Sequence, residues 1–427
     1  MLNYDDSYIR EHMYEGMTGL EMESQRVDQT GHLSHKPHPF TDDKYIDRDF
    51  GEAQTEISAA AADSNEGAAA LMRHELKKLH AKLAETGELL WPFSNPPIIR
   101  DEEDIEIARY TGDKKPSYDY RVYLAVKYGR YKMTYSGIHY NYSFSDVILR
   151  RGFELNGGKA GDDAGYRGYK DRFYLDLAER VLEYSWIPVA LLAASPVADG
   201  SLYDRNLAGE SMFTGCATMR CSDHGYWNPF VPIISYESID GYVDSMEAYV
   251  TEGLLIEARE LYYPVRIKPP GKYTAEALRE KGVQHIELRM IDVNPFSDQG
   301  LDIRDLRFLQ LFLIWLSSLG RARLSDGEQV HAIYNHKSSA QYSWTIARIG
   351  LPGKETRSLK ECVEEVLDSM KEFFAGDDYA LETLSYQTGK VENRELRYAK
   401  RVLREYGKNY IEGGLERARE IQRSYNS

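Results

Sequence analysis

The sequence of 427 residues predicts one compact α+β domain that covers residues 1–427. Stretches in which apolar and polar residues alternate, as in strands, are interspersed with stretches of helical periodicity. No internal repeat or low-complexity segment interrupts this pattern, and the loops predicted at 154–168 and 268–273 do not have the character of domain linkers. Hydrophobic residues make up 42% of the chain and charged residues 28%, which is typical of a folded globular protein.

Apolar spacing and end signals predict the principal helices. They are 68–90, 171–194, a helix capped by Asp302 and closed by Gly320, a helix that follows a capping box of Ser358 and Glu361, and the charged tail 393–427. Pro188 is expected to kink or end the second helix, because proline lacks an amide hydrogen and its ring clashes with the preceding turn. The tail is expected to form a solvated outer layer because it is highly charged.

The charge balance disfavours two classes of partner. The chain has 53 basic and 68 acidic residues, a formal net charge of −15. Nucleic acids and anionic membranes both attract basic surfaces, so neither is expected as a partner. A polyanion such as ATP remains possible if metal ions and a few arginines neutralise it.

Cysteine usage and the apolar segments predict a cytoplasmic protein. The three cysteines, Cys216, Cys221 and Cys362, form no CxxC or zinc motif, and free thiols are expected. The charged N-terminus lacks the apolar core of a signal peptide, and the longest apolar run, 309–320, is too short to cross a bilayer.

The stretch TGLEMESQRV, residues 18–27, predicts a strand with two carboxylates on one face. Leu20 and Met22 would point one way, and Glu21 and Glu23 the other. Two charges about 7 Å apart repel each other by about 2 kcal/mol at an effective dielectric constant of about 20, but only by a few tenths of a kcal/mol in open water. The pair is therefore either solvated or part of a cleft that binds a cation, and the pattern leaves both alternatives open.

Four other stretches carry similar polar residues. They are 47–58 with Asp47, Asp49, Glu52 and Glu56; 136–145 with His139 and Asn141; 217–228 with Arg220, Asp223 and Tyr226; and 285–296 with Glu287 and Arg289. Each residue by itself is more typical of solvated or packing side chains. Together they predict a sheet with one face on the core and one acidic, arginine-containing face. Such a face suits a nucleotide site with several Mg²⁺ ions.

Several common catalytic motifs are absent from the sequence. It has no P-loop GxxxxGK[ST], no GxGxxG after a strand and no GxSxG nucleophile motif. The stretch HELKKLH, residues 74–80, does not match HExxH, because Lys78 stands at the position of the second histidine.

A series of motifs resembles the bacterial glutamate–cysteine ligases of the proteobacterial type. In order along the chain they are GLEMESQRV, DFGEAQTEI, LWPFSNPP, YGRYKMTYSGIHYNYSF, AASP, RCSDHGY, ELYYPVR, IELRMIDVNPF and AKRVLREYGKNYIEGG. The resemblance runs from about Gly19 into the tail. So many motifs in the expected order are far more specific than any one of them.

The resemblance implies a glutamine-synthetase-like fold, in which a curved, mostly antiparallel sheet forms a funnel-shaped active site with helices packed outside. It implies that ATP and two or three Mg²⁺ ions, which Mn²⁺ can replace, serve to join glutamate to cysteine through γ-glutamyl phosphate. The expected protein is a monomer that binds only small molecules. No ATP-grasp domain is expected in this chain, so synthesis of glutathione by this polypeptide alone is not expected.

Site residues follow from the resemblance position by position. The implied Mg²⁺ ligands are Glu21, Glu23, Asp49, Glu56, His139 and Glu287. Arg289 matches an arginine that steadies the transferred phosphoryl group, and Arg220 one that holds the donor glutamate, while Asn141 also falls at a donor-site position. The implied acceptor pocket consists of Phe50, Tyr120, Tyr226 and Tyr262. Ordinary core packing is the alternative for these aromatic residues.

Two positions depart from the family pattern. Met133 stands where relatives have a glutamine whose amide contacts the donor, and Tyr135 replaces a smaller aliphatic residue. The donor is therefore expected to be oriented differently or by another residue. Cysteine remains the expected acceptor, and a different small apolar amino acid or amine is the alternative. The alternative classes are a metal-dependent phosphohydrolase and a catalytically inactive binding protein.

Overall fold

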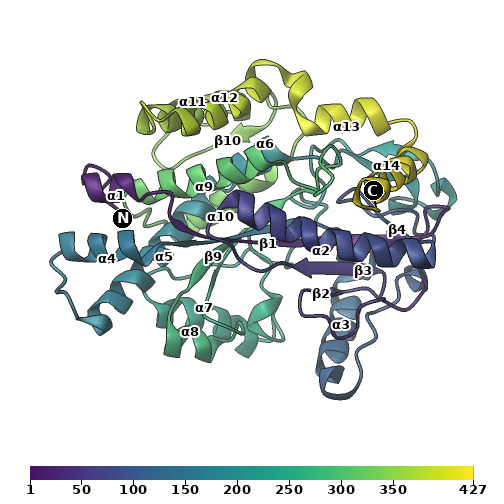
Figure 1. Ribbon diagram of the computed structural model, residues 1–427, viewed down its shortest axis with the longest axis horizontal. Coiled ribbons are helices and arrows are strands. Elements are labelled where there is room, and N and C mark those ends of the chain that lie inside the picture. Colours follow the sequence, from purple (N-terminus) through teal and green to yellow (C-terminus); the bar gives the residue numbers. More distant parts are fainter. Residues whose placement is uncertain (427) are drawn as a thin grey trace.

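The computed structural model describes residues 1–426, and an antiparallel sheet lies at its centre (Figure 1). Within these residues, the largest sheet has the strand order β2–β3–β1–β5–β9–β8, and β4 pairs with β1. Its strands are β1 (Gly16–Val27), β2 (Ile46–Arg48), β3 (Gln54–Ser58), β4 (Leu89–Leu90), β5 (Ile138–Phe144), β8 (Val265–Lys268) and β9 (His285–Ile291). Two short hairpins pair β6 (Val197–Asp199) with β7 (Ser211–Phe213) and β10 (Arg348–Ile349) with β11 (Arg357–Ser358).

Helices surround this sheet. The α-helices are α1 (Ser7–Glu11), α2 (Asn65–Thr86), α3 (Lys115–Tyr128), α4 (Asp146–Leu155), α5 (Asp163–Tyr184), α6 (Trp186–Leu192), α7 (Ile239–Thr251), α8 (Ala275–Lys281), α9 (Ile303–Ser318), α10 (Asp326–Ser339), α11 (Leu359–Phe373), α12 (Asp378–Glu392), α13 (Tyr398–Tyr406) and α14 (Tyr410–Asn426). In the view of Figure 1, α9, α11 and α12 lie above β1, while α3, α7 and α8 lie below it. No helix within residues 1–426 is long and apolar enough to cross a membrane.

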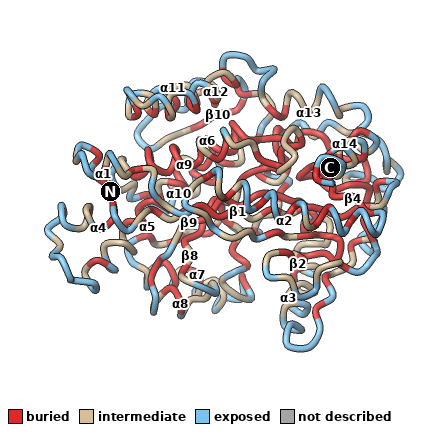
Figure 2. The backbone as a smooth tube through the Cα atoms, viewed as in Figure 1, coloured by how far each residue is buried: buried red, intermediate tan, exposed pale blue. Residues whose placement is uncertain are grey.

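The predicted alternation on the central strands is confirmed. Leu20 and Met22 of β1 and Tyr140 and Tyr142 of β5 belong to the main buried core, which the inner helices α2, α5, α6 and α9 complete. Figure 2 shows this buried region running through the sheet, whereas the outer turns of the helices are exposed. Residues at alternate positions point to the opposite face of the sheet, so the polar residues of these strands face away from the core.

The predicted effect of Pro188 is also confirmed. The helix expected at 171–194 is divided into α5 and α6, and the break lies at Ser185. Proline cannot donate to the carbonyl four residues earlier and its ring crowds that carbonyl, which belongs to Tyr184, the last residue of α5. The break therefore falls one turn before the proline.

Two sequence expectations need correction. Only 156–162 of the predicted loop 154–168 lies outside helices, because Asp162 caps α5 by accepting a hydrogen bond from the Gly165 amide. The tail is helical as predicted, but α14 is not only a solvated layer. Its inner face, including Tyr410 and Leu415, packs with Trp91 and Phe93 in a second core cluster.

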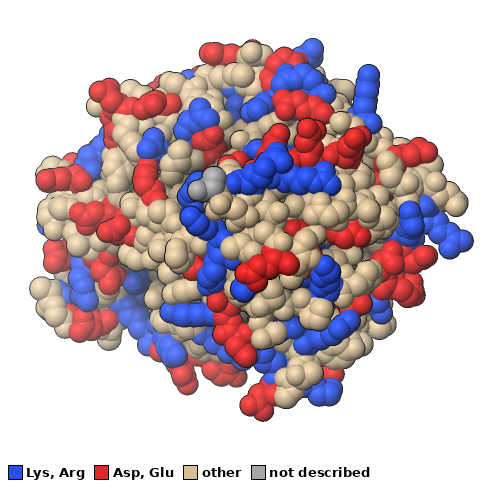
Figure 3. Space-filling model, turned by 45° about the vertical axis from the view of Figure 1, so that its right-hand side comes forward, with Lys and Arg blue, Asp and Glu red and all other residues tan. Residues whose placement is uncertain are grey.

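Charged side chains are distributed over the surface. Figure 3 shows lysine and arginine interspersed with aspartate and glutamate on the face that it displays. The three cysteines are free thiols, as expected.

Candidate active site

A cavity of about 320 Å³ lies on the polar side of the central sheet. All but one of the predicted site residues line it: Glu21, Glu23, Asp49, Phe50, Glu56, Tyr120, Met133, Tyr135, His139, Arg220, Tyr226, Tyr262, Glu287 and Arg289. These residues span most of the chain, so the sheet and its loops gather them into one place.

Strand register brings the carboxylates together. In the antiparallel pairs, Glu21 of β1 lies opposite His139 of β5, and Glu23 of β1 lies opposite Glu56 of β3. Directly opposed residues on a sheet have Cβ atoms about 5 Å apart, so their side chains share the same space above the strands. The two glutamates of β1 therefore belong to one cluster with groups from both neighbouring strands.

An irregularity in the pairing of β5 with β9 adds a third strand to the cluster. Ile138 lies opposite Ile291 and Tyr140 opposite Leu288, so one residue of β5 faces two residues of β9. Such a bulge changes the direction in which the side chains point, and bulges are common beside functional sites. Here the residue of β5 that faces the bulge is His139.

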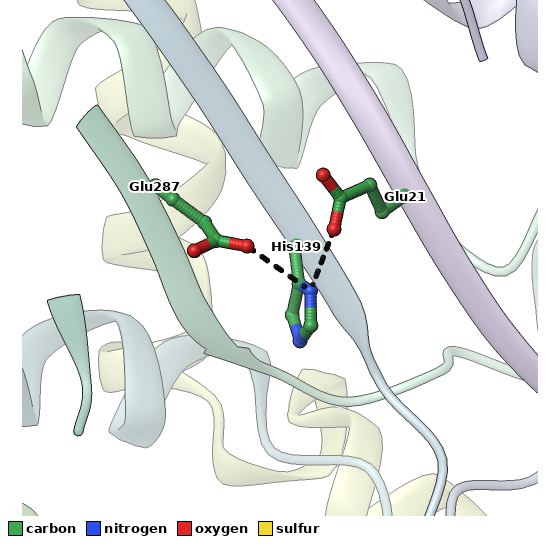
Figure 4. Close-up of side chains that lie close together, drawn as sticks. All are labelled: Glu21, His139 and Glu287. Atoms are coloured by element: carbon green, nitrogen blue, oxygen red, sulfur yellow. Dashed lines mark hydrogen bonds and ion pairs between the residues drawn. The ribbon is translucent and has the colours of Figure 1, made fainter. Parts of the chain in front are cut away.

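Glu21, His139 and Glu287 form a compact group, and Figure 4 shows their side chains converging from the neighbouring strands β1, β5 and β9. His139 Nδ1 lies 3.0 Å from Glu21 Oε2 and 3.5 Å from Glu287 Oε1. One ligand atom from each residue lies within 4.8 Å of the others. Glu23 completes the cluster from the other side, with its Oε1 3.8 Å from His139 Nε2.

The electrostatic environment differs among these carboxyl groups. Burial raises the pKa of Glu23, and burial with the neighbouring Asp49 and Glu21 raises the pKa of Glu56 well above its usual range. Burial opposes ionisation of Glu287 too, but Arg289 and Lys268 outweigh it and hold the pKa of Glu287 well below its usual value. Neighbouring cations thus favour ionisation of Glu287, whereas around Glu23 and Glu56 they do not outweigh burial and the other carboxylates.

The donor set fits a divalent cation. The Glu287 side chain is fully buried, and its Oε2 has no hydrogen-bond partner within residues 1–426. Buried polar atoms without a partner are rare, because each costs about 1–3 kcal/mol. Carboxylate oxygens suit Mg²⁺ or Mn²⁺, and such an ion would satisfy the unpartnered oxygen and offset the charge around Glu23 and Glu56.

Two arginines border the cluster. Arg289 Nη1 donates to Glu287 Oε1 at 2.9 Å, so it lies beside the candidate cation site. Arg220 Nη1 donates to the Ile291 carbonyl at 2.9 Å. Its guanidinium lies against Gly137, where a Cβ would be only 2.2 Å from Arg220 Cζ. Glycine at 137 is therefore required for this position of Arg220.

Aromatic side chains form the opposite part of the cavity. The hydroxyl groups of Tyr226 and Tyr262 are in hydrogen-bonding contact, and both rings meet Tyr128 edge to face. Burial raises the pKa of both Tyr120 and Tyr262, so their hydroxyl groups remain protonated donors at neutral pH. Tyr120, Tyr226 and Tyr262 line the cavity, and the rings of Tyr226 and Tyr262 also pack against each other, so packing does not exclude the pocket interpretation.

Asn141 differs from the other predicted site residues in its surroundings. Asn141 is absent from the described lining of the cavity, and its Nδ2 donates to Glu21 Oε1 at 3.1 Å. Asn141 also lies opposite Glu287 in the sheet. It therefore holds a ligand of the candidate cation site in place. Its buried Oδ1 has no hydrogen-bond partner within residues 1–426, so the assignment of Asn141 to the donor site stays a prediction.

Sequence reasoning missed several basic residues of the cavity. The further charged residues of its lining are Arg121, Lys132, Arg259, Arg266 and Lys268. Arg266 and Lys268 occupy alternate positions of β8, and this spacing of two is a signal that could have identified them. Arg121 comes from α3 and Arg259 from the short 3-10 helix Ala258–Glu260, and only the tertiary structure brings them to the cavity.

Comparisons with known proteins identify the family of this chain. The family model for glutamate–cysteine ligase matches residues 4–254 and 235–338. A glutathione biosynthesis bifunctional protein of Listeria monocytogenes is 35% identical over 340 residues, covering 76% of this chain and 43% of that protein. A second one, from Listeria innocua, is 31% identical and covers 97% of this chain and 55% of its own length. The chain thus spans about half the length of the curated relatives it matches.

Two solved structures share the fold. A bifunctional glutathione synthetase from Pasteurella multocida superposes with a TM-score of 0.82 at 26% identity, over 98% of this chain and 54% of that one. A glutamate–cysteine ligase from Francisella tularensis, solved with AMP, superposes with a TM-score of 0.85 at 21% identity, over 97% of this chain and 89% of that one. The resemblance of the motifs and the predicted fold are both confirmed: this chain belongs to the glutamate–cysteine ligase family.

Proposed function

We propose that this chain joins the γ-carboxylate of glutamate to the amino group of cysteine with consumption of ATP, giving γ-glutamylcysteine, ADP and phosphate. The observation that carries the proposal is the group of Glu21, His139 and Glu287 with Arg289 beside it, in a cavity whose far side is aromatic. Family membership supports the reaction class, in which ATP and a divalent metal are required. The identity and number of the ions, two or three Mg²⁺, are part of the proposal.

The carboxylates and His139 would hold the metal ions. The proposed ligands are Glu21, Glu23, Asp49, Glu56, His139 and Glu287. When bound, the ions would neutralise the polyphosphate of ATP and stabilise charge on the phosphoryl group in transfer. Arg289 lies next to Glu287, where its fixed positive charge can stabilise the transferred group without reorganisation.

Opposite parts of the cavity suit the two amino acids. Arg220 offers a guanidinium for a carboxylate of glutamate, since planar arginine matches a carboxylate with two hydrogen bonds. The hydroxyl groups of Tyr226 and Tyr262 converge and can donate to the carboxylate of the acceptor. Phe50 and Tyr120 would surround its side chain, and this arrangement would orient the amine toward an activated γ-carboxyl group.

Met133 and Tyr135 are the two predicted donor-site residues that depart from the family pattern. Both line the cavity while being only 7% and 8% exposed, and Met133 also packs in the apolar cluster of Phe50 and Leu124. Neither the thioether nor its apolar neighbours supply an amide for the donor amino group. Orientation of glutamate therefore depends more on the charged groups of the cavity, with Arg220 foremost.

The acceptor specificity has one alternative. An aromatic pocket discriminates poorly between a thiol and a methyl group, because one such group changes binding by about 1–3 kcal/mol. A different small apolar amino acid or amine in place of cysteine is therefore the second candidate.

We also propose that the chain acts as one catalytic unit and as a cytoplasmic monomer. A single core cluster includes both Leu2 and Tyr425, which supports one unit. The free thiols Cys216, Cys221 and Cys362 suit a reducing compartment. Light scattering that gave a mass near 49.0 kDa would agree with a monomer, and twice that mass would exclude it.

The decisive experiment is an assay of ADP formation with Mg²⁺ and ATP, in which glutamate and each amino acid are supplied singly and in pairs. A ligase forms ADP only when both glutamate and an amine are present, and mass spectrometry identifies the dipeptide. Release of phosphate with water alone, unchanged by amino acids, would instead indicate a phosphohydrolase. The absence of any Mg²⁺-dependent product would support a binding protein.

A further inference from the structure

We propose that Asp292, which does not touch the cavity, is a positioning residue that fixes Arg220 for binding of the donor glutamate. The inference rests on the proposed function, because Arg220 acts on glutamate only if the chain is a ligase of this kind. It explains why three segments distant in the sequence, 194–195, 217–220 and 291–293, meet at one place.

The Asp292 carboxylate is a buried hub of hydrogen bonds. The residue is 1% exposed and follows directly after β9. Its Oδ2 accepts from the Ala194 amide at 2.8 Å and from Ser195 Oγ at 2.7 Å, and its Oδ1 accepts from Thr218 Oγ1 at 2.9 Å. One side chain thus joins the end of β9 to two loops.

These bonds fix the backbone that carries Arg220. Thr218 is two residues before Arg220, and Ser195 Oγ also accepts from the Met219 amide at 3.3 Å. Ser195 and Thr218 are further joined by a parallel β-bridge. Thr218 is therefore hydrogen-bonded to Asp292, and Met219 is linked to it through Ser195. These links leave the next residue, Arg220, little freedom to move.

The guanidinium itself is fixed from the same side. Arg220 Nη1 donates to the carbonyl of Ile291, the residue before Asp292. Ser94 holds the segment that contains Gly137 close to the segment that contains Asp292. Its Oγ accepts from the Val293 amide at 2.8 Å, and its carbonyl accepts from the Ser136 amide at 2.9 Å. Contacts with the segment 291–293 thus hold both the backbone before Arg220 and its guanidinium.

Packing alone does not explain why a carboxylate is buried at this place. Burial raises the pKa of Asp292, while Arg220 and the three hydrogen bonds lower it. An apolar residue would avoid this cost of burial. A carboxylate can accept hydrogen bonds from several directions at once, and no apolar residue can join three donors from two loops.

Four variants separate positioning from simple stability. Thr218→Val keeps the shape and removes one hydrogen bond of Asp292, and Asp292→Ala removes all three. Asp292→Asn keeps the shape, because its Oδ1 can accept from Ala194 and Ser195 while its Nδ2 donates to Thr218 Oγ1. Thr383→Val is the matched control, since Thr383 is 2% exposed, close to the 1% of Thr218, but its hydroxyl donates to the Tyr379 carbonyl within α12.

The test measures KM for glutamate and for cysteine with the full chain, ATP and Mg²⁺. Thr218→Val is expected to raise KM for glutamate about tenfold, as the loss of one buried hydrogen bond implies, and to change KM for cysteine less than about twofold. Asp292→Ala is expected to raise KM for glutamate further, whereas Asp292→Asn should keep KM for glutamate much closer to its original value. Thr383→Val should lower Tm as Thr218→Val does, with KM for glutamate unchanged.

A second background shows whether the effect passes through Arg220. In an Arg220→Ala protein, adding Thr218→Val should have no further effect on glutamate binding, because residues that act through one another are not additive. If turnover is too slow, the rise of Tm with increasing glutamate concentration gives the same comparison. An equal effect of Thr218→Val in both backgrounds would overturn the proposal.

The outcomes distinguish the inference from the function on which it rests. If Arg220→Ala weakens glutamate binding but Thr218→Val and Asp292→Ala do not, the positioning role is refuted and the donor-site role of Arg220 stands. If Arg220→Ala leaves glutamate binding unchanged, the donor-site assignment is refuted, and with it the role of Asp292.

Discussion

Glu56→Gln should stabilise the metal-free protein and at the same time weaken its response to Mg²⁺. Glu56 of β3 lies directly opposite Glu23 of β1, and Asp49 is a further acidic neighbour. Glutamine has the same shape but no charge. The substitution therefore removes repulsion that only a bound cation would otherwise relieve.

The size of the effect follows from the strand geometry. The Cβ atoms of directly opposed residues lie about 5 Å apart, and two charges at about that separation repel each other by about 3 kcal/mol at an effective dielectric constant of about 20. An entropy of unfolding of about 2 cal/mol/K per residue amounts to about 0.9 kcal/mol/K for 427 residues. Removal of the repulsion should therefore raise Tm by about 3 °C.

The effect should depend on pH with a definite sign. The pKa of Glu56 is raised in the folded protein, because burial and the neighbouring carboxylates oppose its ionisation. Below the pKa of the unfolded chain, 4.5, the group is protonated in both states and costs nothing. Above it, the unfolded chain ionises more easily, so the folded protein loses stability as pH rises. The gain from Glu56→Gln should be about 3 °C at pH 8 and less than about 1 °C at pH 5.

The assay is thermal unfolding in EDTA and in excess Mg²⁺ at both pH values. A ligand at 100 times its Kd stabilises a protein by about 2.7 kcal/mol, so Mg²⁺ should raise the Tm of the original protein by about 3 °C and that of the variant by less. Glu260→Gln is the control. The fully buried Glu260 carboxylate accepts from Lys127, Tyr128 and the Ile256 amide, so loss of its charge should lower the stability of the protein. A Glu56→Gln protein that is less stable than the original in EDTA at pH 8, or equally stabilised by Mg²⁺, would refute the reasoning.

Three further predictions concern catalysis and the contact between α9 and α12. Glu21→Gln and Glu287→Gln should each lower the rate of ADP formation by at least about 100-fold with an unchanged circular dichroism spectrum, since each removes a proposed metal ligand; near-normal rates would contradict the metal assignment. Met133→Gln should alter KM for glutamate and leave KM for the acceptor unchanged, because it adds an amide on the donor side; an unchanged glutamate KM would place Met133 outside the donor site. Asp305→Ala should lower the free energy of unfolding, measured in urea, by about 3–5 kcal/mol. Lys390 is 1% exposed and its Nζ lies 3.0 Å from Asp305, so the substitution would leave a buried charge without its partner. Unaltered stability would show that this ion pair contributes little.

Local patterns predicted the parts of the fold that depend on near neighbours in the sequence. The alternation of Glu21 and Met22 predicted which face of β1 is buried, since successive residues of a strand point to opposite sides. Ser358 and Glu361 form the predicted capping box of α11, and Asp302 caps α9. These features follow from backbone hydrogen bonding within a few residues.

Other features of the site depend on residues distant in the sequence. The inner packing of α14 on Trp91 was missed because charged residues dominate its composition, while its few apolar residues find their partners more than 300 residues earlier. Arg121 and Arg259 enter the cavity from α3 and a short 3-10 helix, and no local pattern fixes their direction. The amide of Asn141 donates to Glu21, although Asn141 lies opposite Gly19 in the register of β1 with β5.

The sequence by itself determined the alternating strands, the helix ends and, through nine motifs in order, the family and the types of residue at the site. Only the tertiary structure decided that Glu21, His139 and Glu287 converge, that Asn141 holds Glu21, and that Asp292 joins the loop of Arg220 to β9. The physical reason is that strand register, the bulge in β9 and loop-to-loop hydrogen bonds connect residues far apart in the chain. Periodicity and capping act only over a few residues, so they carry no information about such contacts.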